Sequence, residues 1–153
     1  ADLPPAESAT LPTKDRPSAP IVKRTPAIDP VVLQWRLARI PGLDIERGLV
    51  LVHGDTARYA RMLALLVDGH ARDAMCLTEG LAANDLETVE RLAHTLKGSA
   101  GNVGALWVAQ AAATLQTAIR SQAVHEEVDT CCHALVAELE RLIEMIEAAL
   151  RGQ

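Results

Sequence analysis

Apolar residues between positions 86 and 103 recur at intervals of three and four without interruption. The series consists of Leu86, Val89, Ala93, Leu96, Ala100 and Val103. Because an α-helix completes a turn about every 3.6 residues, such a series lies along one face of a helix. The stripe is narrow, which is typical of a seam along which helices pack. The segment therefore predicts a helix that begins after a capping residue, Asp85, and buries one side.

Similar periodicity predicts three further long helices. Asp55 is expected to cap one that covers residues 55–84. Gly104 ends the helix of the first stripe, and we expect the others over about residues 105–121 and 126–150. The chain has 26 alanines and 21 leucines, but only two tryptophans, one tyrosine and no phenylalanine. This composition favours helices around an aliphatic core.

Two short helices are expected before the long ones. Asp29 and the proline that follows it are typical of a helix start, and we expect a helix over residues 31–40. Asp44 is expected to cap a second helix that closes near His53. The connections are short, so consecutive helices should pack antiparallel. The sequence predicts an all-α fold, an antiparallel up-down four-helix bundle with short helices at its N-terminal end.

The opening of the chain differs in composition from the rest. All eight prolines lie at or before position 41. Residues 1–27 mix proline, alanine, serine and threonine without apolar periodicity, which is typical of a flexible linker. We expect a linker over residues 1–27 and one helical domain over residues 28–153. Because the chain opens on Ala1 rather than methionine, we also expect a fragment or processed product of a larger protein.

Charge and composition exclude several classes of function. The formal net charge is −5 and no basic block occurs, which argues against nucleic-acid binding and against contact with an anionic membrane. The apolar runs are far shorter than the roughly 20 residues of a membrane-spanning helix. Three cysteines, two of them adjacent, do not resemble a secreted disulfide framework. We expect a monomeric protein in the cytoplasm.

Histidine is the residue type on which chemistry would depend, since the chain has no glycine-rich phosphate loop and no cysteine spacing typical of a metal site. His94 lies roughly 130° around its helix from the centre of the apolar stripe, so it should face solvent. Gly98 and Gly101 share that side of the helix. Glycine inside a helix costs about 0.5 to 1 kcal/mol relative to alanine. The two glycines therefore need a compensating reason, and close approach by another macromolecule is one.

Lys97 is the only lysine after Lys23, and it lies three residues beyond His94. Its ammonium group can reach a group bound to the imidazole, and it would offset a negative charge there. The alternative is an ordinary exposed histidine and lysine, with glycines that fray a helix end. The combination of these residues favours the functional interpretation.

The string His94 to Gly104, HTLKGSAGNVG, resembles the signature of histidine-containing phosphotransfer (HPt) domains. Residues 40–49 resemble the opening segment of HPt domains at the C-terminal end of hybrid sensor kinases. The likeness covers about residues 28–150. It implies a four-helix bundle on which an exposed histidine accepts a phosphoryl group from a receiver-domain aspartate and passes it to another receiver.

The resemblance also implies roles for individual residues. His94 would be phosphorylated, at Nε2, and Lys97 would be the cation beside the phosphoryl group. Gln116 would hydrogen-bond one imidazole nitrogen, which leaves the other as the nucleophile. The surface that docks the receiver would include Gly98, Gly101, Arg91 and Ser99.

The implied partners are response-regulator receiver domains, reached in cis or in trans. Any Mg²⁺ would be held by the receiver, so we expect this chain to bind no metal or cofactor and to be a carrier rather than an enzyme. The parent would be a hybrid sensor kinase, and the domain would lie in the cytoplasm or at the cytoplasmic end of an inner-membrane kinase. Two alternatives remain open: a helical docking module that is never phosphorylated, and an autonomous enzyme.

Other conspicuous residues are interpreted as structural. His70 lies on the apolar stripe of its helix and is expected to be a partly buried packing residue. Trp35 and Trp107 are expected to anchor the core or a helix seam.

Overall fold

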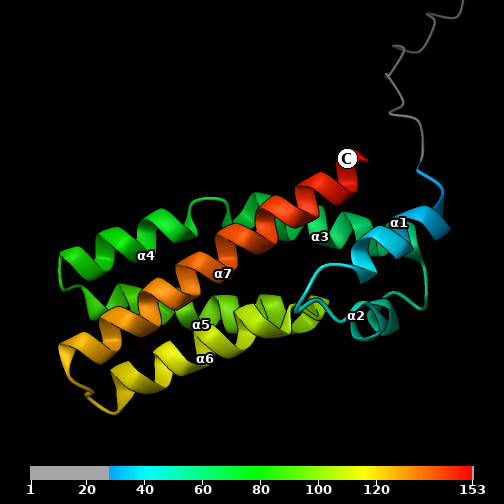
Figure 1. The fold of residues 1–153 in the computed structure, drawn as a ribbon. Coiled ribbons are helices and arrows are strands. Elements are labelled where there is room, and N and C mark those ends of the chain that lie inside the picture. The colour runs from blue at the N-terminus through cyan, green and yellow to red at the C-terminus, as the bar shows by residue number, and fades with distance from the viewer. Residues whose placement is uncertain (1–27, 153) are drawn as a thin grey trace, which may run out of the picture.

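The computed structural model describes residues 28–152. Those residues form seven helices, which are α1 (Pro30–Ala38), α2 (Ile45–Leu51), α3 (Thr56–His70), α4 (Asp73–Ala82), α5 (Leu86–Val103), α6 (Leu106–Arg120) and α7 (His125–Arg151) (Figure 1). The linker expected over residues 1–27 lies outside the described residues. No helix in the described part is long and apolar enough to cross a membrane.

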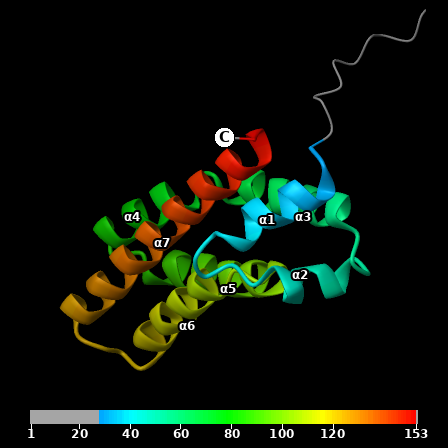
Figure 2. The ribbon, with the colours of Figure 1, turned by 45° about the vertical axis from the view of Figure 1, so that its right-hand side comes forward.

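The long helices form the predicted bundle. Helix α5 packs against α6, α6 against α7, and α4 against both α7 and α5, so four helices surround a common core (Figure 1). Helix α3 extends the α4 side of the bundle and packs against α5 and α7, while α1 and α2 cover that end (Figure 2). The predicted all-α fold, a four-helix bundle preceded by short helices, is therefore confirmed.

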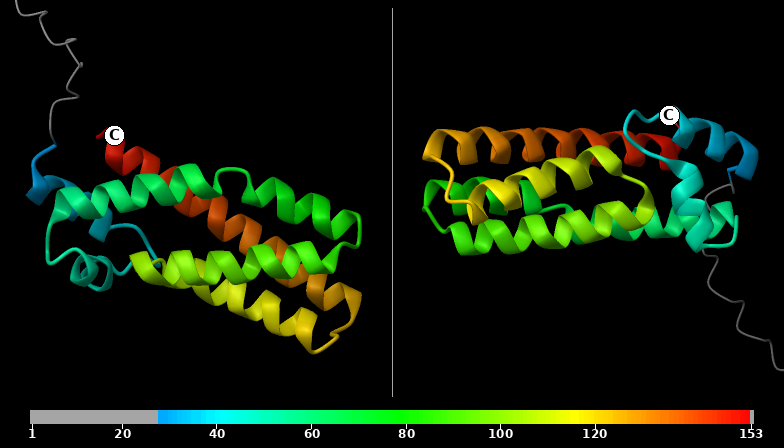
Figure 3. Two further views of the ribbon diagram at one scale, coloured as in Figure 1. Left: turned by 180° about the vertical axis from the view of Figure 1, so that it is seen from behind. Right: turned by 90° about the horizontal axis from the view of Figure 1, so that it is seen from below.

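The expectation of a single helix over residues 55–84 is wrong, because the chain breaks after His70 into α3 and α4 (Figure 3). Gly69 weakens the last turn of α3, and Asp73 is a residue type that stabilises the first turn of a helix. Nδ1 of His70 lies 2.6 Å from a carboxylate oxygen of Asp73 across the break. Apolar spacing continues through the break, so periodicity alone could not reveal it. His70 is partly buried, as expected.

Four aspartates begin helices as predicted. The side chains of Asp29, Asp44, Asp55 and Asp85 accept hydrogen bonds from backbone N–H groups in the first turns of α1, α2, α3 and α5. Such a cap stabilises a helix by about 1 kcal/mol, because it satisfies a donor that has no partner within the helix. The starts of these helices are therefore encoded locally.

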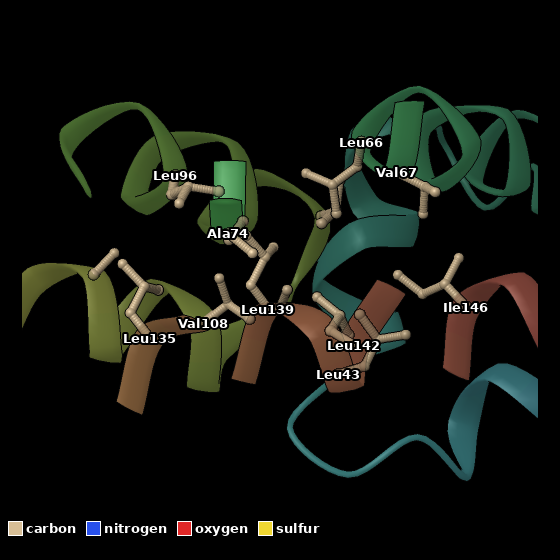
Figure 4. Packing of buried hydrophobic residues seen from close by; sticks show 14 of the residues in the cluster. Leu43, Leu66, Val67, Ala74, Leu96, Val108, Leu135, Leu139, Leu142 and Ile146 are labelled. Atoms are coloured by element: carbon tan, nitrogen blue, oxygen red, sulfur yellow. The ribbon is translucent and has the colours of Figure 1, made fainter. Parts of the chain in front are cut away.

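The core is aliphatic, with Tyr59 as its one aromatic member among the described residues. Figure 4 shows side chains from several helices directed into it. Trp35 and Trp107 were expected in the core or at a helix seam, and the structure excludes the core, since they are 60% and 48% exposed. Each instead lies under an arginine: the guanidinium carbon of Arg39 is 4.6 Å from the ring centroid of Trp35, and that of Arg141 is 5.2 Å from that of Trp107. Cation–π contact stabilises an aromatic ring at the surface.

Helix α2 is clamped to the C-terminal end of α5. The backbone N–H of Asp44 donates to the carbonyl of Gly104 over 2.7 Å. Gly104 has φ +85°, and a Cβ there would collide with the carbonyl oxygen of Asp44, so only glycine fits. Gly48 similarly packs against the ring of Tyr59, whose hydroxyl donates to the carbonyl of Val103 over 2.7 Å. These contacts place α2 beside the face of α5 that bears His94.

Candidate functional site

His94 lies in the middle of α5 with its side chain exposed. Its neighbours Ala93 and Leu96 are fully buried in the bundle, and they fix the rotation of the helix about its axis. The imidazole is therefore held at the surface by a rigid element rather than by a loop. A group placed in this way can be positioned closely against a reaction partner.

Gln116 of α6 supports the imidazole from behind. Its side-chain nitrogen, Nε2, lies 3.1 Å from Nδ1 of His94. Gln116 is only 4% exposed, although its side chain is a polar amide. Because burying an amide is costly unless it is hydrogen-bonded, the contact with His94 compensates for that burial. The structure thus brings together two residues that are 22 positions apart.

The direction of this hydrogen bond determines which ring nitrogen is nucleophilic. With the amide nitrogen toward His94, Nδ1 accepts and the proton of a neutral imidazole lies on Nε2. A half-turn of the amide places Oε1 there instead. Nδ1–H then donates to Oε1, and Nε2 carries the free lone pair. The same pair of residues therefore supports a nucleophilic Nε2 in one of its two amide orientations.

Gly98 and Gly101 form an open floor next to His94. A Cβ built on either glycine would meet no atom within 4 Å, so no packing inside the bundle requires a glycine at these positions. Each glycine costs the helix about 0.5 to 1 kcal/mol. That cost is consistent with space kept free for a macromolecule that approaches the imidazole.

A groove runs over this floor between α5 and α2. It is lined by Arg47, Val50, Leu51, His94, Lys97, Gly98, Gly101 and Asn102. None of these lining residues is acidic, and Lys97 and Arg47 bring two cations to the groove that holds the imidazole. The α2 residues were not predicted. One signal could have revealed them: the run Leu49 to Val52 is wholly apolar, and a single short helix cannot bury all of it.

A second, more charged groove lies on the other side of His94. It is lined by Glu87, Glu90, Arg91, His94, Gln116 and Arg120. Nε of Arg120 lies 2.5 Å from a carboxylate oxygen of Glu90, which links α6 to α5 near the Gln116 contact. Of the remaining predicted docking residues, Arg91 lines this groove, whereas Ser99 is half-buried and lines neither groove.

The other titratable groups do not form a competing site. His70 is paired with Asp73, and Nδ1 of His133 lies 2.8 Å from the carbonyl oxygen of Asp129. Burial raises the pKa of the Cys132 thiol to about 11, which makes it a poor nucleophile. Among the described residues, no group of three or more histidines, cysteines and carboxylates could hold a metal ion.

Comparison with known proteins identifies one family. A model of the family described as "Hpt domain" matches residues 61–152, which include His94, Lys97, both floor glycines and Gln116. Neither the curated proteins nor the solved structures contain a significant match to this chain.

Proposed function

Because the chain belongs to the HPt domain family, whose members are phosphotransfer carriers of phosphorelays, we propose that His94 is the residue that carries the phosphoryl group. The observation that supports this most strongly is the buried amide of Gln116 at Nδ1 of an otherwise exposed histidine. His94 accepts the group from a receiver-domain aspartyl phosphate and passes it to the aspartate of another receiver.

In the proposed step, the lone pair of His94 Nε2 attacks the phosphorus atom in line. The N–P bond forms as the P–O bond to the aspartate breaks, and the carboxylate leaves with the electron pair. Nδ1 keeps its proton, which Oε1 of Gln116 accepts as a hydrogen bond. Attack by the carboxylate of a second receiver reverses these bond changes and restores the neutral imidazole.

The transition state spreads negative charge over the equatorial phosphoryl oxygens, so cations and positioning supply most of the catalysis. Lys97 is exposed in the same groove as His94, and we assign it to these oxygens. That groove has no carboxylate among its lining residues, and a hard cation prefers oxygen ligands. We therefore assign any Mg²⁺ that the transfer requires to the receiver.

We further infer that the chain is a module of a hybrid sensor kinase in the cytoplasm, on the resemblance of residues 40–49 to the opening of such domains. Its receivers would be reached in cis or in trans, with the bundle itself monomeric. The docking surface includes Gly98 and Gly101, which leave the imidazole open to approach.

A two-step transfer experiment tests this function. The chain is incubated with a ³²P-phosphorylated receiver, separated from it, and then mixed with a second, unlabelled receiver. A carrier takes up the label and then loses it to the second receiver. A helical docking module that is never phosphorylated takes up none, and an autonomous enzyme would release inorganic phosphate without a second receiver.

A further inference from the structure

Helix α2 presents large apolar side chains to solvent beside His94. Val50 is 74% exposed and Leu51 is 56% exposed, and both line the groove that contains the imidazole. The opposite side of the same helix is buried through Gly48 and Leu49. An exposed apolar pair at the edge of a functional groove is typical of a protein interaction site.

The position of this apolar pair is fixed. Gly104 and Gly48 allow backbone and ring contacts that a Cβ would prevent, so they hold α2 against the end of α5 (Figure 2). Because the contacts at Gly48 and Gly104 hold α2 in place, its outer face is a preformed wall of the groove. A preformed surface loses little conformational freedom when a partner binds.

The charges of the groove indicate the chemistry of its occupant. Arg47 lies on the same wall, is exposed, and makes no salt bridge within residues 28–152. Lys97 lines the floor opposite, and no lining residue is acidic. The groove therefore suits a protein that brings a negative group to His94 and an apolar patch to α2. A receiver with an aspartyl phosphate meets the first requirement, since that group is anionic.

We propose that Arg47, Val50 and Leu51 select which receiver exchanges the phosphoryl group with His94. This inference rests on the proposed function, because it concerns the partner of that same reaction. The reacting bonds are identical for every aspartyl phosphate, so the groups at His94 cannot distinguish one receiver from another. Discrimination between receivers therefore has to come from side chains that do not take part in the reaction. Arg47, Val50 and Leu51 on α2 are side chains of this kind.

The test compares a Val50→Asp variant with a Leu65→Asp control. Leu65 is 70% exposed on α3 and lines neither groove, so the two substitutions are matched in exposure and chemistry. Each protein is phosphorylated by phosphoramidate, whose phosphorus–nitrogen bond breaks with release of ammonia as the bond to the imidazole forms. This small donor needs no docking surface. Each protein is also tested with a panel of three phosphorylated receivers, and circular dichroism checks the fold.

Val50→Asp should still be labelled by phosphoramidate, and this labelling rate is the reference against which its transfer from each receiver is compared. The second-order rate constant for its phosphorylation should fall about tenfold with the best receiver and by a smaller factor with the others, so the order of preference changes. Leu65→Asp should behave as the unaltered chain with every donor. If Val50→Asp does not fold, Arg47→Glu at the rim of the same wall serves instead.

Two results would overturn the inference while leaving the proposed function intact. One is unchanged transfer to the α2 variant from every receiver, and the other is a loss of equal size with all three. Labelling of the unaltered chain by phosphoramidate but by no receiver would overturn both the inference and the proposed exchange with receivers, and would show only that the imidazole is reactive. Failure of both kinds of donor to label His94 in the unaltered chain would instead refute the proposed function, and the inference with it.

Discussion

The side-chain amide of Gln116 lies 3.1 Å from Nδ1 of His94 and bridges α6 to α5. Gln116 occupies a buried position next to Leu115, which is fully buried, where an apolar residue would pack at lower cost. The amide therefore orients the imidazole at a cost to the stability of the bundle. Every prediction about the reaction depends on this contact or on the groove beside it.

Replacement of Gln116 by leucine should lower the rate of phosphoryl transfer about tenfold to a hundredfold, the range found when a residue that orients a metal-bound histidine is removed. The fold should persist, because leucine suits a buried position. Gln110→Leu, on the exposed side of the same helix, is the control. Nitrogen-15 NMR of the His94 ring should show the Nδ1–H tautomer in the unaltered chain and a mixture in Gln116→Leu. An unaltered rate and tautomer in Gln116→Leu would remove Gln116 from the mechanism.

Replacement of Lys97 by alanine should slow transfer about tenfold, because a cation beside the phosphoryl oxygens is lost. Its free energy of unfolding should change by less than about 0.5 kcal/mol, since the side chain is exposed and makes no salt bridge within the described residues. Transfer reactions that are quenched at timed intervals give the rate of transfer, and denaturant unfolding gives the free energy of unfolding. Lys97→Arg should retain part of the rate. A transfer rate in Lys97→Ala equal to that of the unaltered chain would exclude an electrostatic role.

Replacement of Gly98 by leucine should stabilise the protein by up to about 1 kcal/mol and yet block transfer from receivers. The stabilisation follows from helix propensity, and the block follows because leucine fills the open floor. Gly69→Leu is a matched control, because Gly69 is also helical and exposed, and a Cβ at that position would meet no atom within 4 Å. Only Gly98→Leu should lose transfer. Normal transfer by a more stable Gly98→Leu protein would show that the floor is not a docking surface.

Stability should fall at high pH because of Tyr59. Burial, and then the charge of Asp44, raise the pKa of the Tyr59 hydroxyl above its ordinary value of 10.0. The unfolded chain therefore loses this proton first, so the contribution of Tyr59 is fully present below pH 10 and is lost as the pH rises above it. Cys132 adds a similar loss between pH 9 and 11, because burial raises its pKa from 9.0 to about 11.

Denaturant unfolding at neutral pH and above pH 10 measures this loss in the unaltered chain and in Tyr59→Phe. The variant should be about 1 kcal/mol less stable at neutral pH, because the bond to Val103 is gone, and should lose less stability above pH 10. The chain has one tyrosine, so tyrosinate absorbance follows this group alone. Tyrosinate formation at its ordinary pH in the folded protein would contradict the prediction.

Local signals explain why much of the fold was predictable. The four aspartate caps and the stripe from Leu86 to Val103 depend on residues close in sequence, and both agree with the structure. The break after His70 was missed because the apolar spacing is the same on both sides of it. The tryptophans lie outside the core, although their size favours burial in general, because leucine and alanine already fill it.

The site was partly accessible from the sequence as well. The exposure of His94 follows from helical geometry, and the role of Gln116 is implied by the resemblance to a family rather than by spacing. Helix α2 itself was predicted from its Asp44 cap, but its position beside α5 was not, because that position depends on contacts of Gly104 and Gly48 with distant residues. The sequence shows an apolar run there, but not which part of it faces the groove.

The most direct test of the account is the chemical identity of the label after incubation with a phosphorylated receiver. We expect one phosphoryl group that is labile in acid and stable in alkali, as a phosphorus–nitrogen bond to imidazole requires. It should be absent from His94→Gln and present in His133→Gln, which alters another exposed histidine. Label that persists in His94→Gln, or that is stable in acid, would contradict the assignment of His94 as the phosphoryl carrier.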